Sequence, residues 1–176
     1  MSLQHCGIFG PGQSGKTTLA KQLVKQMSAR HGFSSLVLDP NREKWEGAAY
    51  CTDDEEQFWK TVWASEKCFV VAEEATETIA RDKSLTRIFT RIRHNGHKLC
   101  IIGHNGTNLL PIMREQIHYL HLFRQPEASA KLWADTMAED RLMRATSLRR
   151  YEFVRCIQFG DTATGDNLVE TCKLKL

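Results

Sequence analysis

A lysine and two threonines directly follow a glycine-rich stretch near the start of the chain. Residues 7–23 read GIFGPGQSGKTTLAKQL, in which four residues separate Gly10 from the run Gly15-Lys16-Thr17. This is the spacing of a phosphate-binding loop, where glycines let the backbone approach the phosphates and successive amide N–H groups surround them. The lysine ammonium reaches the outer phosphates, and the hydroxyl after it binds Mg²⁺. The spacing therefore predicts that the chain binds a nucleoside triphosphate, with ATP and Mg²⁺ as the expected cofactors.

The elements that flank this loop agree with the prediction. The apolar run HCGIF is typical of a short buried strand, and an amphipathic helix is expected from about Lys16 to Arg30. By analogy with other such loops, Thr18 is expected to contact the α-phosphate. The residues predicted to bind the nucleotide are Gly10, Pro11, Gly12, Gln13, Ser14, Gly15, Lys16, Thr17 and Thr18.

A second apolar run ends in two adjacent glutamates. Residues 68–72 read CFVVA, and Glu73 and Glu74 follow. Because neighbouring residues of a strand project to opposite sides, the two carboxylates cannot share one task. We assign Glu73, together with Thr17, to the Mg²⁺ site and Glu74 to polarising the attacking water. The alternative is a pair of exposed acids that begin a helix at Ala75.

Length and composition indicate one globular domain. The 176 residues are 41% hydrophobic and 26% charged, and the net charge of +3 is too small to argue for nucleic acid by itself. The six cysteines are scattered without a CxxC pair, which favours reduced thiols over a zinc site. No run approaches the ~18 apolar residues that span a bilayer, and the N-terminus has no basic leader. We therefore expect a cytoplasmic protein without an integral membrane segment.

Strand-like and helix-like patterns alternate over the first 147 residues. Such alternation predicts an α/β fold with a mostly parallel sheet and helices on both faces. Beyond residue 150, two extended runs surround a Gly/Asp/Thr-rich connection, so we expect a core over 1–150 and an attached β-hairpin over 151–176. Strands are expected near 5–9, 34–40, 68–72, 98–105 and 117–123, and helices near 16–30, 53–64, 84–95 and 127–147.

The order of these motifs resembles the FtsK–HerA group of P-loop ATPases. More narrowly, it is similar to the small genome-packaging ATPases of tailless, membrane-containing viruses such as tectiviruses. The resemblance covers roughly residues 5–125 and implies a RecA-like core with the strand at 98–105 between the phosphate-loop strand and the glutamate strand. The motifs that carry it are the phosphate loop, LDPNREKW after the second strand, the glutamate pair, and RIRHNGHKLCIIGHN.

The resemblance also implies roles for residues outside the loop. A polar residue that ends the strand at 98–105 would sense the γ-phosphate, and the matching segment offers His104 or Asn105. A neighbouring subunit would supply an arginine, for which the candidates are Arg93, Arg114 and Arg124. We favour Arg114, because the segment after the sensor strand commonly reaches the neighbour. These roles imply a homo-oligomeric ring whose active sites are completed between subunits.

The activity implied by the resemblance is ATP hydrolysis that pumps double-stranded DNA into a capsid. The expected partners are non-specific duplex DNA and capsid or packaging-vertex proteins, and the expected location is the host cytoplasm or the packaging vertex of the virion. Two groups of basic residues suit contact with phosphates, although either could equally be a solvated helix face. These groups are Arg87, Arg91, Arg93, His94, His97 and Lys98, and Arg141, Arg144, Arg149 and Arg150.

Three other functions were weighed against DNA translocation. A small-molecule kinase of the adenylate-kinase type could use Asp39, at the end of the second strand, to bind an acceptor hydroxyl. A filamentous-phage export ATPase shares the core but usually carries a membrane helix. A GTPase switch needs an Asn-Lys-x-Asp motif, which this sequence lacks.

Overall fold

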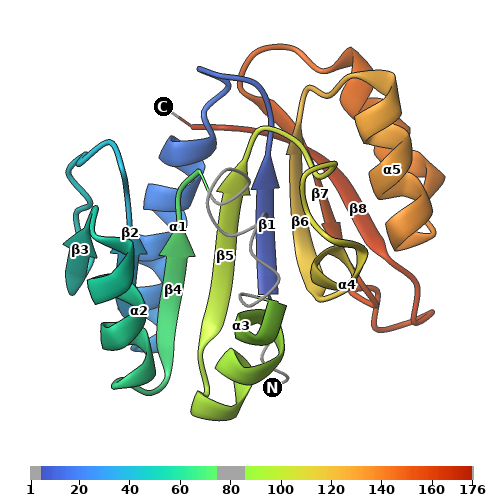
Figure 1. Ribbon diagram of the computed structural model, residues 1–176. Coiled ribbons are helices and arrows are strands. Elements are labelled where there is room, and N and C mark those ends of the chain that lie inside the picture. Colours follow the sequence, from blue (N-terminus) through green and yellow to red (C-terminus); the bar gives the residue numbers. More distant parts are fainter. Residues whose placement is uncertain (1–4, 75–85, 176) are drawn as a thin grey trace.

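One eight-stranded sheet forms the centre of the computed structural model, which describes residues 5–74 and 86–175 (Figure 1). The spatial order is β3-β2-β4-β5-β1-β6-β7-β8. Strands β1 to β6 run parallel to one another, whereas β7 is antiparallel to both β6 and β8. The strands are β1 His5–Phe9, β2 Ser34–Leu38, β3 Tyr50–Thr52, β4 Cys68–Ala72, β5 Lys98–Gly103, β6 Ile117–Phe123, β7 Glu152–Ile157 and β8 Leu168–Lys173.

Strand β5 lies between β1 and β4, as the resemblance implied. All three strands are parallel, so their carboxyl ends meet at one edge of the sheet. The phosphate loop follows β1, the glutamate pair follows β4, and His104 follows β5. This edge, where loops leave the carboxyl ends of parallel strands, is where ligands bind in open α/β sheets.

Helices cover both faces of the sheet, which confirms the predicted α/β architecture. The helical elements are α1 Lys16–His31, α2 Glu55–Trp63, α3 Thr86–Arg91, η3 Ile92–Asn95, α4 Pro111–Arg114, α5 Glu127–Met137 and η4 Asp140–Ser147. None of the helices within the described ranges combines the length and the apolar character needed to cross a bilayer.

The single helix predicted over 127–147 is wrong, because the chain breaks it in two. Ala138 takes the left-handed conformation, with φ of 50°, and ends α5. The carboxylate of Glu139 then accepts a hydrogen bond from the N–H of Arg141 and caps the 3₁₀ segment η4. The helical pattern of apolar residues continues across the break, so the periodicity gave no sign of it. The short elements β3 and α4 were also missed.

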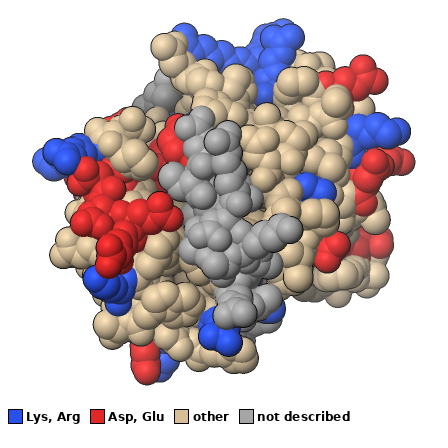
Figure 2. All heavy atoms as spheres, in the orientation of Figure 1, with Lys and Arg blue, Asp and Glu red and all other residues tan. Residues whose placement is uncertain are grey.

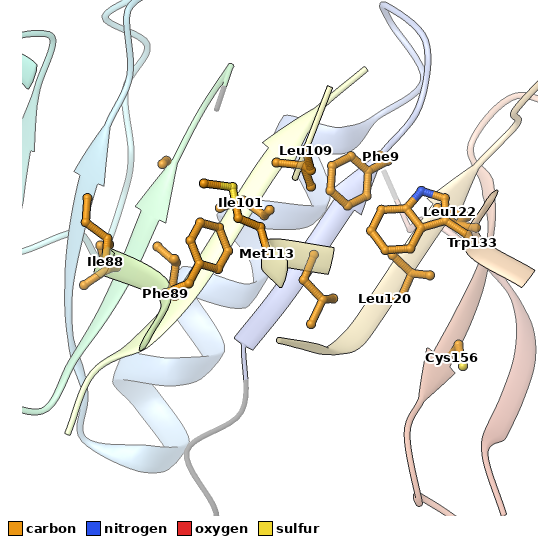
Figure 3. Packing of buried hydrophobic residues seen from close by; sticks show 14 of the residues in the cluster. Phe9, Ile88, Phe89, Ile101, Leu109, Met113, Leu120, Leu122, Trp133 and Cys156 are labelled. Carbon is orange, nitrogen blue, oxygen red and sulfur yellow. The ribbon is translucent and has the colours of Figure 1, made fainter. Parts of the chain in front are cut away.

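Alternation along the strands divides the core into two layers. In β1, Ile8 packs on the α1 side and Phe9 on the opposite side. The ring centroids of Phe9 and the fully buried Trp133 of α5 lie 4.9 Å apart, and Leu109 and Met113 pack in the same layer (Figure 3). Helix α5 and the loop after β5 therefore share one apolar cluster with the strand that leads into the phosphate loop.

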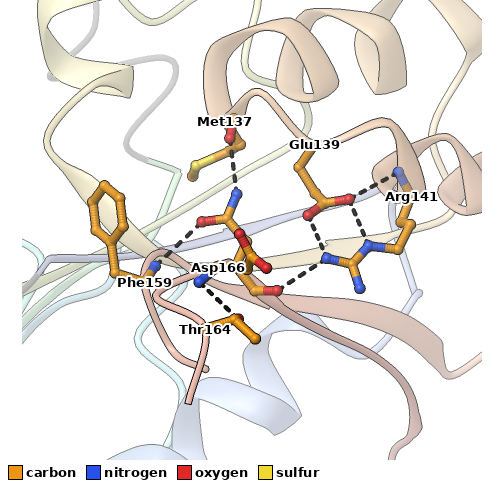
Figure 4. Close-up of polar contacts among 7 residues, drawn as sticks. Met137, Glu139, Arg141, Phe159, Thr164 and Asp166 are labelled. Atoms are coloured by element: carbon orange, nitrogen blue, oxygen red, sulfur yellow. Dashed lines mark hydrogen bonds and ion pairs between the residues drawn. The ribbon is translucent and has the colours of Figure 1, made fainter. Parts of the chain in front are cut away.

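The hairpin of β7 and β8 is fixed to the body of the protein by polar contacts (Figure 4). The Arg141 guanidinium forms two hydrogen bonds of 2.7 Å with the Glu139 carboxylate and donates another to the Asn167 carbonyl at 3.0 Å. The Asn167 amide donates to the Met137 carbonyl at 3.0 Å. The expected hairpin is thus present, and it extends the sheet through β6.

Replacing Gly106 by Ala is expected to destabilise the protein by about 1–3 kcal/mol, the usual cost of overpacking a core. A Cβ at this position would lie 2.5 Å from ring atoms of the buried Trp133. Urea unfolding of the nucleotide-free protein measures the effect. Gly12→Ala is the matched control, because a Cβ there has no atom within 4 Å among the described residues. Equal stability of the two variants would contradict the packing argument.

Candidate nucleotide site

The phosphate loop closes tightly between β1 and α1. The Gly10 N–H donates to the Gly103 carbonyl at 3.2 Å, which ties the loop to the end of β5. Gly15 has a φ of 104° and leaves no room for a side chain, since a Cβ would lie 2.7 Å from Leu174 and 3.2 Å from Tyr151. This position therefore requires glycine for both its conformation and its space.

Lys16 lies almost completely buried at the centre of the loop. Its ammonium donates to the Pro11 carbonyl at 2.9 Å and so folds back across the loop. Burial lowers the pKa of Lys16, while the carboxylates of Glu73 and Glu74 act in the opposite direction. The buried Ser14 hydroxyl has no hydrogen-bond partner among the described residues. A buried ammonium and an unpaired hydroxyl, in a cradle that excludes side chains, fit an anionic ligand.

The structure brings together the two residues predicted to hold Mg²⁺. The Thr17 hydroxyl donates to a Glu73 carboxylate oxygen at 2.5 Å, and the Glu73 side chain is 3% exposed. The backbone N–H of Glu73 donates a hydrogen bond to the Leu38 carbonyl, which fixes the end of β4 against β2. The pKa of Glu73 is raised above its ordinary value, mainly by burial. The charge of Asp39 raises it further, and the hydrogen bond from Thr17 acts in the opposite direction.

Glu74 lies in a turn after the end of β4, so the alternation expected of a strand does not determine where its side chain points. Its backbone is left-handed, with φ of 52°, and a carboxylate oxygen lies 3.5 Å from Nε2 of His104. Asn105 instead accepts hydrogen bonds from the Thr107 N–H at 3.2 Å and the Thr107 hydroxyl at 2.6 Å. Of the two sensor candidates, His104 contacts the glutamate pair, whereas Asn105 stabilises its own turn.

The arginine candidates occupy three different environments. The Arg114 guanidinium donates to the carbonyls of Leu109 at 2.5 Å and Gly106 at 3.2 Å in its own chain, and burial lowers its pKa. Arg124 follows β6 and is exposed in a cavity of about 510 Å³ that His104 also lines. Arg93 belongs to η3, which precedes β5 and so lies at the opposite edge of the sheet from the phosphate loop.

Two residues that sequence reasoning did not place at this site border the phosphate loop. A pocket of about 380 Å³ is lined by residues 13–18 of the loop and by Arg150 and Tyr151, which precede β7. Nε of Arg150 donates to the Gln13 carbonyl at 3.4 Å. The sequence places Arg150 only among the basic residues suited to DNA, because no sequence pattern links it to a loop so distant along the chain.

Two residues of the basic groups predicted to contact DNA, His97 and Arg141, make contacts within the protein instead. His97 is fully buried; it accepts from the Cys68 N–H at 3.0 Å and hydrogen-bonds the Val62 carbonyl at 3.1 Å. Burial lowers the pKa of His97, so the prediction that it extends a positive patch is wrong. Arg141 is paired with Glu139. Figure 2 shows Lys and Arg gathered along the upper edge of one face, and acidic residues on both its left and its right.

Replacing Glu73 by Gln is expected to raise the free energy of unfolding of the nucleotide-free protein near neutral pH. The pKa of Glu73 is raised, so the folded state binds this proton more tightly than the unfolded chain. The charged carboxylate therefore costs stability once the pH exceeds its ordinary value of 4.5. Gln keeps an oxygen acceptor for Thr17 without the charge.

Thermal or urea unfolding over about pH 4 to 8 tests this expectation. The gain in stability of the Glu73→Gln variant should be absent at the acid end and grow as the pH rises. A variant that is less stable than the wild type throughout the range would show that the buried charge is better compensated than the geometry indicates.

Comparison with known proteins identifies the fold. No family model and no curated protein sequence matches the chain. Among solved structures, the genome packaging NTPase B204 from Sulfolobus turreted icosahedral virus 2, in complex with AMPPCP, is 15% identical with a TM-score of 0.77, over 99% of this chain and 100% of that one. VirB4 of Thermoanaerobacter pseudethanolicus is 11% identical with a TM-score of 0.70, over 98% and 89%.

The N-terminal domain of zonular occludens toxin from Neisseria meningitidis is also similar. It is 12% identical with a TM-score of 0.59, over 99% of this chain and 96% of that one. At such identities the likeness concerns the fold, and it extends over nearly the whole length of each protein. Together with the strand order, it shows that the chain shares the α/β fold of these proteins, a mostly parallel sheet flanked by helices.

Proposed function

We propose that this protein is an ATPase that couples hydrolysis to the movement of double-stranded DNA, and that it packages a viral genome. The observation that carries the proposal is the hydrogen bond between Thr17 and Glu73, which joins the phosphate loop to the strand of the glutamate pair. Structural similarity to a packaging NTPase, which was solved with AMPPCP and with ATP-gammaS, supports both the nucleotide and the process.

The residues at this edge fit MgATP. Thr17 would bind Mg²⁺ directly and Glu73 through water, and the metal would draw negative charge from the phosphates when bound. The described residues contain no group of three His, Cys, Asp or Glu side chains able to hold a metal ion. A Mg²⁺ ion here would therefore depend on the nucleotide, as it commonly does in nucleotide-hydrolysing enzymes.

The chain's own residues divide the hydrolytic step between them. Lys16 neutralises charge on the outer phosphates, and the loop amides with Thr18 hold the inner ones. Glu74 orients the attacking water and accepts its proton. His104 senses the γ-phosphate through its contact with Glu74. Because phosphoryl transfer rests on position and charge, these roles need little covalent participation by the protein.

Assembly and partners follow from the same proposal. Subunits form a homo-oligomeric ring in which an arginine of one subunit, by preference Arg114, completes the site of the next. In the present conformation Arg114 binds carbonyls of its own chain, so this role requires it to exchange those bonds for the neighbour's phosphate. The exposed arginines bind duplex DNA without sequence preference, and capsid or packaging-vertex proteins receive the ring in the host cytoplasm.

The kinase alternative loses the residue that favoured it. Asp39 is 1% exposed, and its carboxylate accepts hydrogen bonds from the N–H groups of Asn41 and Glu43 and from the Trp45 indole. These bonds shape the loop after β2 and leave the carboxylate enclosed. Asp39 is therefore better explained as a structural residue than as the site of an acceptor hydroxyl.

Replacing Glu74 by Gln should lower ATP turnover by about 10²–10⁴-fold, the usual contribution of a general base. Binding of ATP should stay within about twofold of the wild type, because the phosphate loop and Thr17 are untouched. Steady-state hydrolysis and equilibrium titration measure the two quantities. Wild-type turnover in this variant would remove Glu74 from the mechanism, and Glu56→Gln serves as a control on an exposed glutamate of α2 that the mechanism does not use.

ATP turnover per subunit should rise with protein concentration and rise again with duplex DNA, since the ring completes each site and DNA is its substrate. A dilution series with and without DNA measures both effects. The stimulation by DNA should weaken steeply between about 50 and 200 mM salt, as phosphate contacts do. Turnover independent of both protein concentration and DNA would contradict a ring-shaped translocase.

A further inference from the structure

We infer that Arg150 and Tyr151 form the subsite that holds the base of the bound nucleotide. This inference rests on the proposed function and adds to it the part of the site that binds the nucleoside. Both residues lie immediately before β7, where the chain returns from η4 to the sheet. They reach the phosphate loop only because the hairpin is the continuation of the same sheet.

The direction in which the nucleotide leaves the loop is set by the residues on either side of β1. Glu73, Glu74 and His104 follow β4 and β5, which lie on one side of β1. They fix the end of the triphosphate that carries the metal and the γ-phosphate. Strands β6 and β7 lie on the other side. The nucleoside must therefore extend toward β6 and β7.

The surface on that side suits a flat aromatic ligand. The Arg150 guanidinium lies over the Tyr151 ring, with 4.7 Å between its central carbon and the ring centroid. Arg150 is exposed and lines the pocket of about 380 Å³ beside the loop, together with Thr18. A guanidinium plane supported by an aromatic ring offers a stacking surface for a base. Stacking of this kind favours purines, whose rings are larger.

The backbone holds this surface in place. Tyr151 is left-handed, with φ of 66°, a conformation that a bulky residue adopts only where its surroundings enforce it. The Leu174 N–H donates to the Tyr151 carbonyl at 2.8 Å, and Gln22 of α1 donates to the Lys175 carbonyl at 2.7 Å. Figure 1 shows the C-terminal end of the chain beside the start of α1. The end of the chain thus locks Tyr151 against Gly15.

Calorimetric titration with MgATP and with magnesium tripolyphosphate separates the base from the phosphates. Arg150→Ala and Tyr151→Asn should each raise the dissociation constant of ATP about tenfold, the usual loss when one stacking partner is removed. Asn is chosen because it tolerates the left-handed backbone. The dissociation constant of tripolyphosphate should stay within about twofold, because that ligand has no base to stack.

Three control variants show which interaction with ATP is lost. Tyr151→Phe keeps the ring and should bind ATP like the wild type, whereas Arg150→Lys keeps the charge without the plane and should behave like Arg150→Ala. Lys16→Ala should weaken binding of both ligands. Unchanged ATP binding in Arg150→Ala and Tyr151→Asn would overturn the inference, and so would an equal loss of tripolyphosphate. A wild-type protein that binds neither ligand would overturn the proposed function as well.

Discussion

The short hydrogen bond from Thr17 to Glu73 connects the two sequence motifs on which the candidate site depends. It can form only because β5 separates β1 from β4 by one strand, so that the first turn of α1 faces the end of β4 across a single strand width. The Glu73 N–H bond to Leu38 and the Gly10 bond to Gly103 hold the same edge from both sides. Strand order is thus the constraint that brings three distant segments together in one candidate site.

The candidate site holds two charged side chains, Lys16 and Glu73, that are largely buried from water. Burial lowers the pKa of Lys16 and raises the pKa of Glu73, so it favours the neutral form of each. Each group is retained in this environment at a cost in stability, which is the usual signature of a site arranged for a ligand rather than for the empty fold. A magnesium–triphosphate complex would supply both the anion that Lys16 requires and the cation that Glu73 requires.

The C-terminal hairpin contributes more than an extra edge to the sheet. Its polar contacts with Glu139, Arg141 and Met137 join it to the helical layer that also buries Trp133. The same layer supports the loop that presents His104, since Gly106 packs directly on the Trp133 ring. The hairpin and the loop that presents His104 therefore both contact α5.

The sequence by itself determined the phosphate loop, the glutamate pair, most strands and the α/β class, because these depend on spacing and periodicity within short segments. It also predicted that Thr17 and Glu73 lie close together, and the hydrogen bond between their side chains agrees with this. Tertiary structure alone decided that His97 is buried and that the Asp39 carboxylate is bonded within its own loop. It also decided that helix α5 ends at Ala138 and that Arg150 and Tyr151 border the phosphate loop. Local patterns record which face of an element is apolar. They do not record which distant segment covers that face, because such contacts are selected by packing and hydrogen bonding over the whole chain.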